Sequence, residues 1–315
     1  MSVDAIGPVI VTPSVLSGSM INNLTSDQAS IAALQNEIAT GYSVNVASDN
    51  PAQAANILQL QAGVTRARKY ATNAQDGVSW LSLANSTVGS ALTVLNQVAS
   101  AVEGLSGYVA SGSASAVAGV GTVLTNARSE LIDLANTQYA GQAIFSGTGT
   151  PKQAYDATGN YVGAGTAPSR TVAPNSSVPI SVTGPAIFGI TKPTATPKST
   201  GLLGPSGLLA KIATLLQKGT SASITKVATT LLGTLQKAVT NVQTQAGKLG
   251  ADQQAMEAFS SQAADASTAL QQELASAQDV TMAQALTNLQ LQQNSYQAAL
   301  LVTSKLKTLS LVNYL

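Results

Sequence analysis

The sequence of 315 residues contains no cysteine and no histidine. Without cysteine there can be no disulfide, no thiolate nucleophile and no thiolate metal ligand. Without histidine the chain lacks the commonest general base and every imidazole ligand. Its 14 acidic residues are scattered, with neither paired-carboxylate nor calcium-loop spacing. An enzyme is therefore the class that the sequence supports least, and we expect no catalytic residue, no metal and no cofactor.

Aromatic residues (4%) and charged residues (9%) are also scarce, whereas apolar residues make up 44% of the chain. An interior built mostly from Ala, Leu, Val and Ile suits slender helical bundles better than a thick globular core. Gln, Asn, Ser and Thr take the place of charges on the exposed faces. Such faces are easily buried against copies of themselves, because little charge is desolvated. Composition alone fits self-assembly and a neutral monomer equally well.

The net charge of +1 gives no electrostatic case for binding nucleic acid or an acidic membrane surface. No run approaches 18 consecutive apolar residues, so we expect no membrane-spanning segment. The N-terminus lacks a charged region followed by a continuous apolar core, as a Sec-type signal peptide would have. We therefore expect a protein that either stays in the cytoplasm or is exported without a cleaved signal peptide.

The strongest pattern in the chain is a stripe over residues 57–102 that alternates steps of three and four. This averages 3.5 residues, the repeat of helices that wind round one another. Asn50, Pro51 and Gln53 supply an N-cap, a first-turn proline and a capping-box residue for this helix. All positions of the stripe except Asn85 are apolar: Ile57, Leu60, Val64, Ala67, Ala71, Ala74, Val78, Leu81, Asn85, Val88, Leu92, Leu95, Ala99 and Val102.

A helix with such a stripe needs a partner, and a strict seven-residue spacing later in the chain predicts one. Gln245 and Asp252 occupy companion positions there. They either set the register of the pair, as polar seam residues can, or lie at a bundle edge facing water. Both readings stay open. The seven-residue spacing is carried by Leu235, Val242, Leu249, Met256, Ala263 and Leu270.

Weaker stripes lie at both ends of the chain and are diluted by glutamine. They bury too little to hold a lone helical pair against its ordering entropy, so neighbouring molecules would have to supply the missing burial. The N-terminal stripe comprises Ile21, Leu24, Gln28, Ile31, Gln35 and Ile38, and the C-terminal one Met282, Leu286, Leu289, Gln293, Tyr296, Leu300, Leu306 and Leu309.

Residues 144–206 differ from the rest, because they are rich in Gly, Pro, Thr, Ser and Val with short alternating runs. They predict a small β-rich insertion of short strands. We expect a mainly α fold: a long antiparallel helical bundle or coiled coil formed by the N- and C-terminal regions, with a small β-rich inserted domain. The expected domains are residues 1–45 with 272–315 (terminal helices), 46–142 with 207–271 (helical rod) and 143–206 (insert).

Several motifs at both ends resemble the bacterial flagellin superfamily. Residues 34–41 (LQNEIATG) followed by 47–52 (ASDNPA) look like its N-terminal signature, and 290–306 (QLQQNSYQAALLVTSKL) like its C-terminal helix. The similarity covers about residues 20–148 and 230–315. Within the superfamily, 142–148 (QAIFSGT) and 310–315 (SLVNYL) are more similar to hook-associated junction proteins of the hook-associated protein 3 type than to filament flagellins.

The resemblance implies a structural component of the flagellum that joins hook to filament by coiled-coil assembly. The alternatives are the filament flagellin itself and, from another class, a secreted adhesive module whose insert binds a ligand. The implied partners are copies of the chain in a ring or helical tube, other hook-associated proteins, flagellin and a flagellar export chaperone, with no nucleic acid and no membrane.

By the same resemblance the protein is exported unfolded to the extracellular flagellum without signal cleavage. Its terminal helices are disordered before assembly and pair only beside neighbouring subunits. The residues expected at this assembly interface are Leu24, Ile31, Ile38, Leu286, Leu289, Tyr296, Leu300, Leu306 and Leu309.

Overall fold

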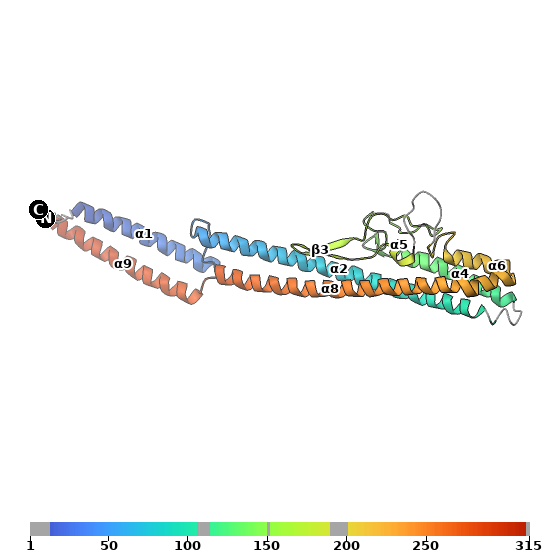
Figure 1. The fold of residues 1–315 in the computed structure, drawn as a ribbon. Coiled ribbons are helices and arrows are strands. Elements are labelled where there is room, and N and C mark those ends of the chain that lie inside the picture. The colour runs from blue at the N-terminus through green and yellow to red at the C-terminus, as the bar shows by residue number, and fades with distance from the viewer. Residues whose placement is uncertain (1–12, 106, 108–113, 150–151, 190–200, 313–315) are drawn as a thin grey trace, which may run out of the picture. The chain divides into compact units, whose positions relative to one another are not determined.

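The computed structural model describes residues 13–105, 107, 114–149, 152–189 and 201–312. Contacts divide the chain into two compact units. Unit 1 combines residues 1–65 with 267–315, and unit 2 comprises residues 66–266. Most of the described chain is helical (Figure 1), and each unit is described by itself below.

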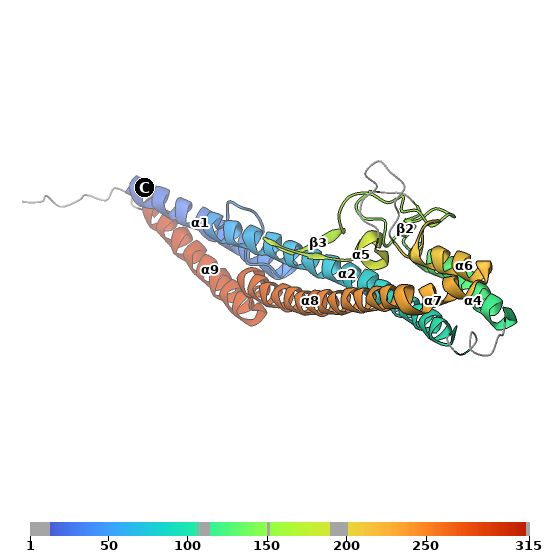
Figure 2. The same ribbon diagram turned by 45° about the vertical axis from the view of Figure 1, so that its right-hand side comes forward.

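In unit 1, α1 (Pro13–Thr40) lies beside α9 (Met282–Val312) in antiparallel orientation. The side-by-side pairing of these sequence-distant helices is visible in Figures 1 and 2. Helix α1 ends where Gly41 takes a left-handed conformation (φ 77°) and donates its N–H to the Glu37 carbonyl at 2.8 Å. A glycine in this conformation is a common helix stop, because it carries no Cβ.

Helix α2 (Pro51–Glu103) begins with the predicted cap, since Asn50 Oδ1 accepts the Gln53 N–H at 3.1 Å. The first part of α2 belongs to unit 1 and lies against the last part of α8 (Leu232–Gln278). A Cβ at Gly63 would lie 3.2 Å from Leu270 Cδ1, so the Leu270 side chain packs directly on the backbone of α2 here.

In unit 2, α2 and α8 again run antiparallel. Asn85 Nδ2 donates to Gln253 Oε1 at 3.4 Å, and Gln236 Nε2 donates to Glu103 Oε1 at 3.3 Å. The partner that the seven-residue spacing predicted is thus confirmed. Four of its residues have no exposed surface: Leu235, Val242, Leu249 and Met256.

Helix α2 also buries a second face in unit 2, which the apolar stripe in the sequence does not predict. That face is lined mostly by small side chains, so it does not stand out as an apolar stripe. It belongs to the same hydrophobic core as α4 (Ala114–Ala135) and α6 (Leu208–Lys218), which contact each other. The residues of this second face are Gly77, Trp80, Ala84, Thr87, Ala91, Val94 and Val98.

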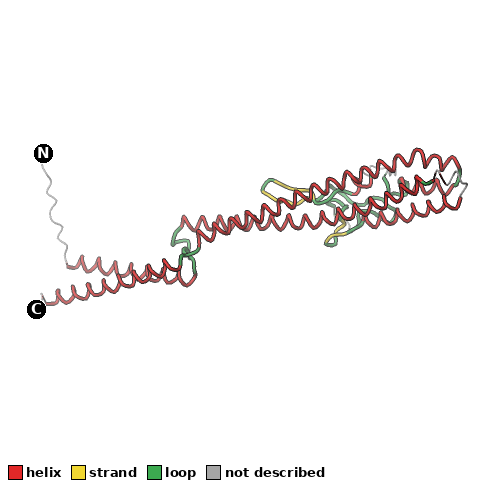
Figure 3. The backbone as a smooth tube through the Cα atoms, turned by 90° about the horizontal axis from the view of Figure 1, so that it is seen from below, coloured by secondary structure: helices red, strands yellow, loops and turns green. Residues whose placement is uncertain are grey.

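The predicted small β region between the helices is confirmed as two short antiparallel hairpins with a single-turn helix (Figure 3, strands yellow), but it begins before residue 143, because the first hairpin lies in residues 138–143, of which 138–142 were expected in the helical rod. The first hairpin pairs β1 (Gln138–Tyr139) with β2 (Gln142–Ala143). The second pairs β3 (Ser169–Ala173) with β4 (Ser176–Pro179) and leads to α5 (Gly184–Phe188). The largest side chains with less than 2% exposure among the described residues come from this region: Tyr155, Phe145 and Phe188.

After α6, the short helix α7 (Ser221–Lys226) passes through a π-helical turn, η1 (Val227–Leu231), into α8. The predicted fold class, mainly α with antiparallel long helices and a small β insert, is therefore confirmed. Residues 143–206 share unit 2 with the helices that enclose them. The division into three domains stays a prediction.

By length and composition alone, α2 is apolar enough to cross a membrane, and no other described helix is. The core helix of a soluble protein passes the same test. The apolar stripe of α2 is the one that packs on α8, which is sufficient reason for its hydropathy.

Candidate assembly surface

The contact between α1 and α9 is a seam of alternating steps of four and three on both helices. On α1, the half-buried positions at this spacing are Met20, Leu24, Asp27, Ile31, Leu34 and Ile38. On α9, the corresponding positions are Ala285, Leu289, Gln292, Tyr296, Ala299 and Thr303. Only Ala285, at 3% exposure, is fully buried among them, so the seam excludes water poorly.

A polar pair lies within this seam. Gln292 Nε2 donates to Asp27 Oδ1 at 2.8 Å, and both side chains are half-buried. Neither residue belongs to the stripes predicted from the sequence. The spacing of Leu24, Asp27 and Ile31 was the signal that could have placed Asp27 there, because 24, 27 and 31 continue the three–four alternation.

The structure divides the nine predicted interface residues into three groups. Five occupy the seam: Leu24, Ile31, Ile38, Leu289 and Tyr296. Leu286 and Leu300 lie outside it and are 50% and 44% exposed. Leu306 and Leu309 belong to α9, but their side chains are outside the described residues.

At alternate positions of the α1 stripe, the residues predicted to lie in the seam differ from those that lie there in the structure. Gln28 and Gln35, expected in the α1 stripe, are exposed, and Leu34 takes a seam position instead. A helical stripe permits either the i+3 or the i+4 neighbour of each seam residue, and only the partner helix decides which one is covered. The stripe was therefore placed on the correct side of α1, but shifted at every second position.

Large exposed apolar side chains gather in unit 1. Among the described residues, unit 2 contributes only Val123 and Val162 to this set. Isolated exposed apolar residues are ordinary, but a concentration of them marks an interaction surface. The members in unit 1 are Ile21, Tyr42, Val46, Leu58, Met282, Leu286, Leu291, Leu300, Leu301 and Val302. We call this set the exposed apolar set.

Charge is nearly absent around the exposed apolar set on α9. Within the part of α9 whose side chains are described, Lys305 is the only charged residue. Burying such a face desolvates little charge, so the penalty that opposes the docking of charged surfaces is small here. Apolar side chains with few charges are what a helix needs to pack against further helices.

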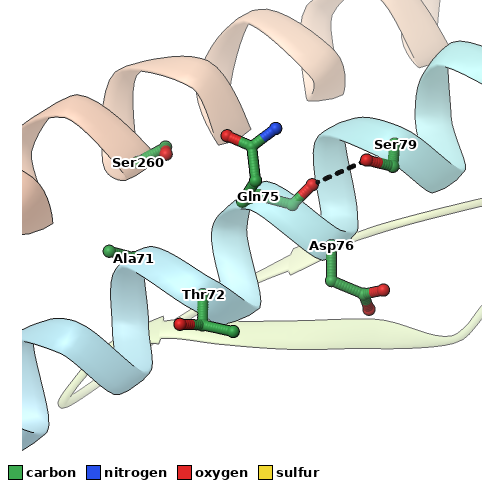
Figure 4. Close-up of a pocket in the computed structure, with 6 residues that line it drawn as sticks. All are labelled: Ala71, Thr72, Gln75, Asp76, Ser79 and Ser260. Atoms are coloured by element: carbon green, nitrogen blue, oxygen red, sulfur yellow. Dashed lines mark hydrogen bonds between the residues drawn. The ribbon is translucent and has the colours of Figure 1, made fainter.

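Other features of the molecule have structural explanations. The groove in Figure 4 has a volume of about 460 Å³ and is lined by Ala71, Thr72, Gln75, Asp76, Ser79 and Ser260. Its carboxylate is already engaged, because Arg170 Nε donates to Asp76 Oδ2 at 2.9 Å and so ties β3 to α2. Within the described residues, no three His, Cys, Asp or Glu side chains are placed to hold a metal ion.

The shifted pKa values also reflect packing rather than reactive chemistry. Burial raises the pKa of Tyr155 and of Tyr161, which lie in the aromatic core of the insert. Burial acts against ionisation of Asp156 too, but hydrogen bonds from Thr158 and Asn160 outweigh it and lower the pKa of this carboxyl. These groups stabilise the turns and core of the insert.

Comparisons with known proteins agree with these features. The model of the bacterial flagellin N-terminal helical region matches residues 12–150, and that of the C-terminal helical region matches residues 232–315. No match was found among curated protein sequences.

Two solved structures share the fold. A putative flagellar hook-associated protein from Vibrio parahaemolyticus matches with a TM-score of 0.62 and 19% identity, over 73% of this chain and 100% of that one. FlgL from Bacillus cereus matches with a TM-score of 0.54 and 16% identity, over 69% and 99% of the two chains. The two flagellin regions together account for both helical ends of the sequence, and the chain therefore belongs to the bacterial flagellin family.

Proposed function

We propose that this flagellin-family protein is a structural component of the extracellular flagellum that joins hook to filament. The observation that carries the proposal is the part of the exposed apolar set that lies on α1 and α9, because the seam between these two helices is itself poorly buried. The fold shared with a putative hook-associated protein and with FlgL supports the junction branch.

Assembly works through burial. The seam residues, such as Leu24 and Leu289, hold α1 against α9, while Leu286 and Leu300 dock on neighbouring copies. Fully burying a leucine contributes about 1.5–3 kcal/mol, so each such contact with a neighbour adds to the burial within the seam in favour of the ordered terminal helices. The partners we propose are copies of this chain, other hook-associated proteins, flagellin and an export chaperone, with export that needs no cleaved signal peptide.

A gene deletion with complementation tests the junction role. Cells without the gene should secrete flagellin into the medium and carry bare hooks, and the wild-type gene should restore filaments. The double variant Leu286→Asp/Leu300→Asp should fail to restore them. The matched control Val123→Asp/Val162→Asp places the same charges at exposed apolar positions of unit 2 and should restore filaments. Intact filaments on the deletion strain would refute the proposal.

Filament flagellin is the second candidate, because the two matched regions are those of bacterial flagellin itself. Copy number in purified flagella separates the two roles. Thousands of subunits along each filament would refute the junction role, and a single short zone would refute the filament role. The adhesive insert, the absence of enzymatic activity and the absence of membrane binding stay predictions.

A further inference from the structure

The two units differ in charge, although the whole chain is nearly neutral. Unit 1 contains six acidic and two basic residues, whereas unit 2 contains eight acidic and thirteen basic residues. Their formal net charges are therefore −4 and +5. Residues 1–65 and 249–304 contain no lysine or arginine, and residues 157–251 contain no aspartate or glutamate. Basic charge is thus concentrated in unit 2 and is nearly absent from unit 1.

Five lysines of unit 2 lie on consecutive helices (Figure 2). Helix α6 turns at Gly219, which is left-handed (φ 63°), into α7, and α7 continues through η1 into α8. Helix α6 contacts both α7 and η1. Its apolar face is buried, and its two lysines, seven residues apart, share the exposed face. The five exposed lysines, which we call the lysine surface, are Lys211, Lys218, Lys226, Lys237 and Lys248.

The lysine surface is not neutralised within its own copy. None of its members forms an ion pair within the described residues, although Lys248 acts electrostatically on Asp252, one helical turn later. The carboxylates on the neighbouring helices are Glu103 at the end of α2, and Glu130 and Asp133 on α4. Three carboxylates near five lysines leave this surface positive.

Contact with water alone does not account for the lysine surface. A charged helix face is ordinarily a solvated one, and lysines commonly serve solubility. In this chain only 9% of residues are charged, and the exposed faces carry Gln, Asn, Ser and Thr instead. Five lysines on consecutive helices without a carboxylate among them therefore favour an acidic partner surface, because potentials across protein interfaces are complementary.

An acidic surface of this kind is present in unit 1. Glu37 lies in the last turn of α1, and Glu273 and Asp279 lie near the end of α8. Backbone hydrogen bonds between the linker after α1 and residues 278–280 hold these helix ends together. No basic residue is present in the segments that carry the three carboxylates. A second copy of this chain therefore supplies the charge that the lysine surface lacks.

We propose that, in the assembly, the lysine surface of one copy docks on Glu37, Glu273 and Asp279 of the next copy. This inference rests on the proposed function, because it specifies one contact through which copies assemble. The terminal segments need not be folded beforehand, since residues 1–65 and 249–304 are anionic in any conformation. Their carboxylates attract the lysine surface as these segments become ordered beside a neighbour.

The contact is heterologous, because the two surfaces belong to different units. Each copy offers its lysine surface to one neighbour and its carboxylates to another. Contacts of this type build rings or helical tubes. Neighbours aligned without an offset would place like charges opposite each other, so charge favours copies that are offset along the assembly.

Carbodiimide cross-linking of flagella isolated from wild-type cells tests the contact directly. The reagent forms an amide bond between a lysine Nζ and a carboxylate that are in contact, and it takes up the water that is released. Lys237 and Glu273 both lie on α8, roughly 54 Å apart along the helix, so a link between them can only join two copies. Mass spectrometry of the peptides should identify links from the lysine surface to Glu37, Glu273 or Asp279.

Charge reversal in the deletion strain gives a second readout. Lys218→Glu/Lys226→Glu should fail to restore filaments, and so should Glu273→Lys/Asp279→Lys, because each sets like charges against each other. The fourfold variant should restore filaments, because the two surfaces are again complementary with their signs exchanged. Its recovery also shows that the substituted chains fold.

The matched control is Arg66→Glu/Lys69→Glu, which makes the same change in charge at exposed positions of unit 2 outside the lysine surface and should restore filaments. The inference is overturned if the links are absent, if the lysine surface links only to another protein, or if the fourfold variant restores filaments no better than the double variants. Bare hooks on the deletion strain together with such a result leave the junction role standing. Intact filaments on that strain with the links present refute the junction role alone.

Discussion

The rod seam in unit 2 and the terminal seam in unit 1 follow the same three–four alternation but reach different burial. In the rod, Leu235, Val242 and Leu249 have no exposed surface. In the terminal seam, Leu24 and Leu289 remain half-buried. Both pairs are antiparallel, so orientation and period do not explain the difference.

The difference comes from the second layer. In unit 2, α2 is covered on one side by α8 and has a further buried face in the core that includes α4 and the insert. In unit 1, every described seam position of the α1–α9 pair except Ala285 keeps part of its surface exposed. A two-helix seam buries one face of each helix, so its stability depends on whether something covers the remaining faces. In the terminal pair, we propose that this cover comes from neighbouring copies.

The largest effect on stability is expected for a substitution in the rod seam. Leu249→Ala should lower the free energy of unfolding by about 2–5 kcal/mol, because it leaves a cavity in a fully buried seam. Leu291→Ala removes the same atoms from a side chain that is 61% exposed on α9 and should change it by less than about 0.5 kcal/mol. Urea unfolding curves measure both, and equal losses would contradict the comparison.

A second change should make the terminal seam resemble the rod. Replacing the polar pair with Asp27→Leu/Gln292→Leu should slow amide exchange in α1 and α9 roughly tenfold. This corresponds to about 1.4 kcal/mol in the free energy of local opening. The reason is that two apolar side chains take the place of a half-buried polar pair. Gln292→Leu alone is the control, since it leaves Asp27 without its donor and should speed exchange. Unchanged exchange in the double variant would show that the pair does not limit the seam.

A smaller effect is expected where the second hairpin meets α2. A double-mutant cycle on Asp76→Ala and Arg170→Ala should give a coupling below about 1 kcal/mol, because both side chains are about a third exposed. The hairpin also keeps the hydrogen bond from Asn73 Nδ2 to the Thr171 carbonyl at 2.9 Å. The coupling should weaken in high salt, and a larger, salt-independent value would make this ion pair a main support of the insert.

The smallest effect concerns pH. Burial raises the pKa of Asp252, against an opposing effect of Lys248. A raised folded-state pKa stabilises the fold below the unfolded-state pKa, and this contribution is lost as pH rises through the folded-state value. Asp252→Asn should therefore be slightly more stable than the wild type at pH 7, with the gap closing below roughly pH 4. The control is Asp265→Asn, an exposed position on α8, and the opposite sign would indicate that Asp252 is stabilised as a carboxylate.

Period and turn chemistry made much of the fold predictable. The matching periods of the α2 stripe and the α8 heptads predicted that these two helices pair. Asn50 and Gln53 predicted where α2 begins. The insert was predictable because its prolines, glycines and alternating runs are incompatible with long helices. The second buried face of α2 was not, because residues such as Ala84 and Ala91 do not form a recognisable apolar stripe.

The candidate surface was predictable only in part. The sequence alone determined that terminal stripes exist and that glutamine and serine surround them. It did not determine that Leu289 faces α1 while Leu286 faces outward, because adjacent positions of a wide stripe are equivalent until a partner helix covers one of them. The Asp27–Gln292 pair was hidden for the same reason.

The amino-acid sequence by itself determined the antiparallel helical pairs, the inserted hairpins and the absence of histidine and cysteine chemistry, since these follow from periodicity and composition. Only the tertiary structure decided which faces of the terminal helices stay uncovered and where α8 ends. Which face stays uncovered depends on which helix lies opposite, and α8 ends where its last carbonyls accept hydrogen bonds from Ser43 and Gln53. Both are contacts between segments far apart in the chain, which no local pattern can specify.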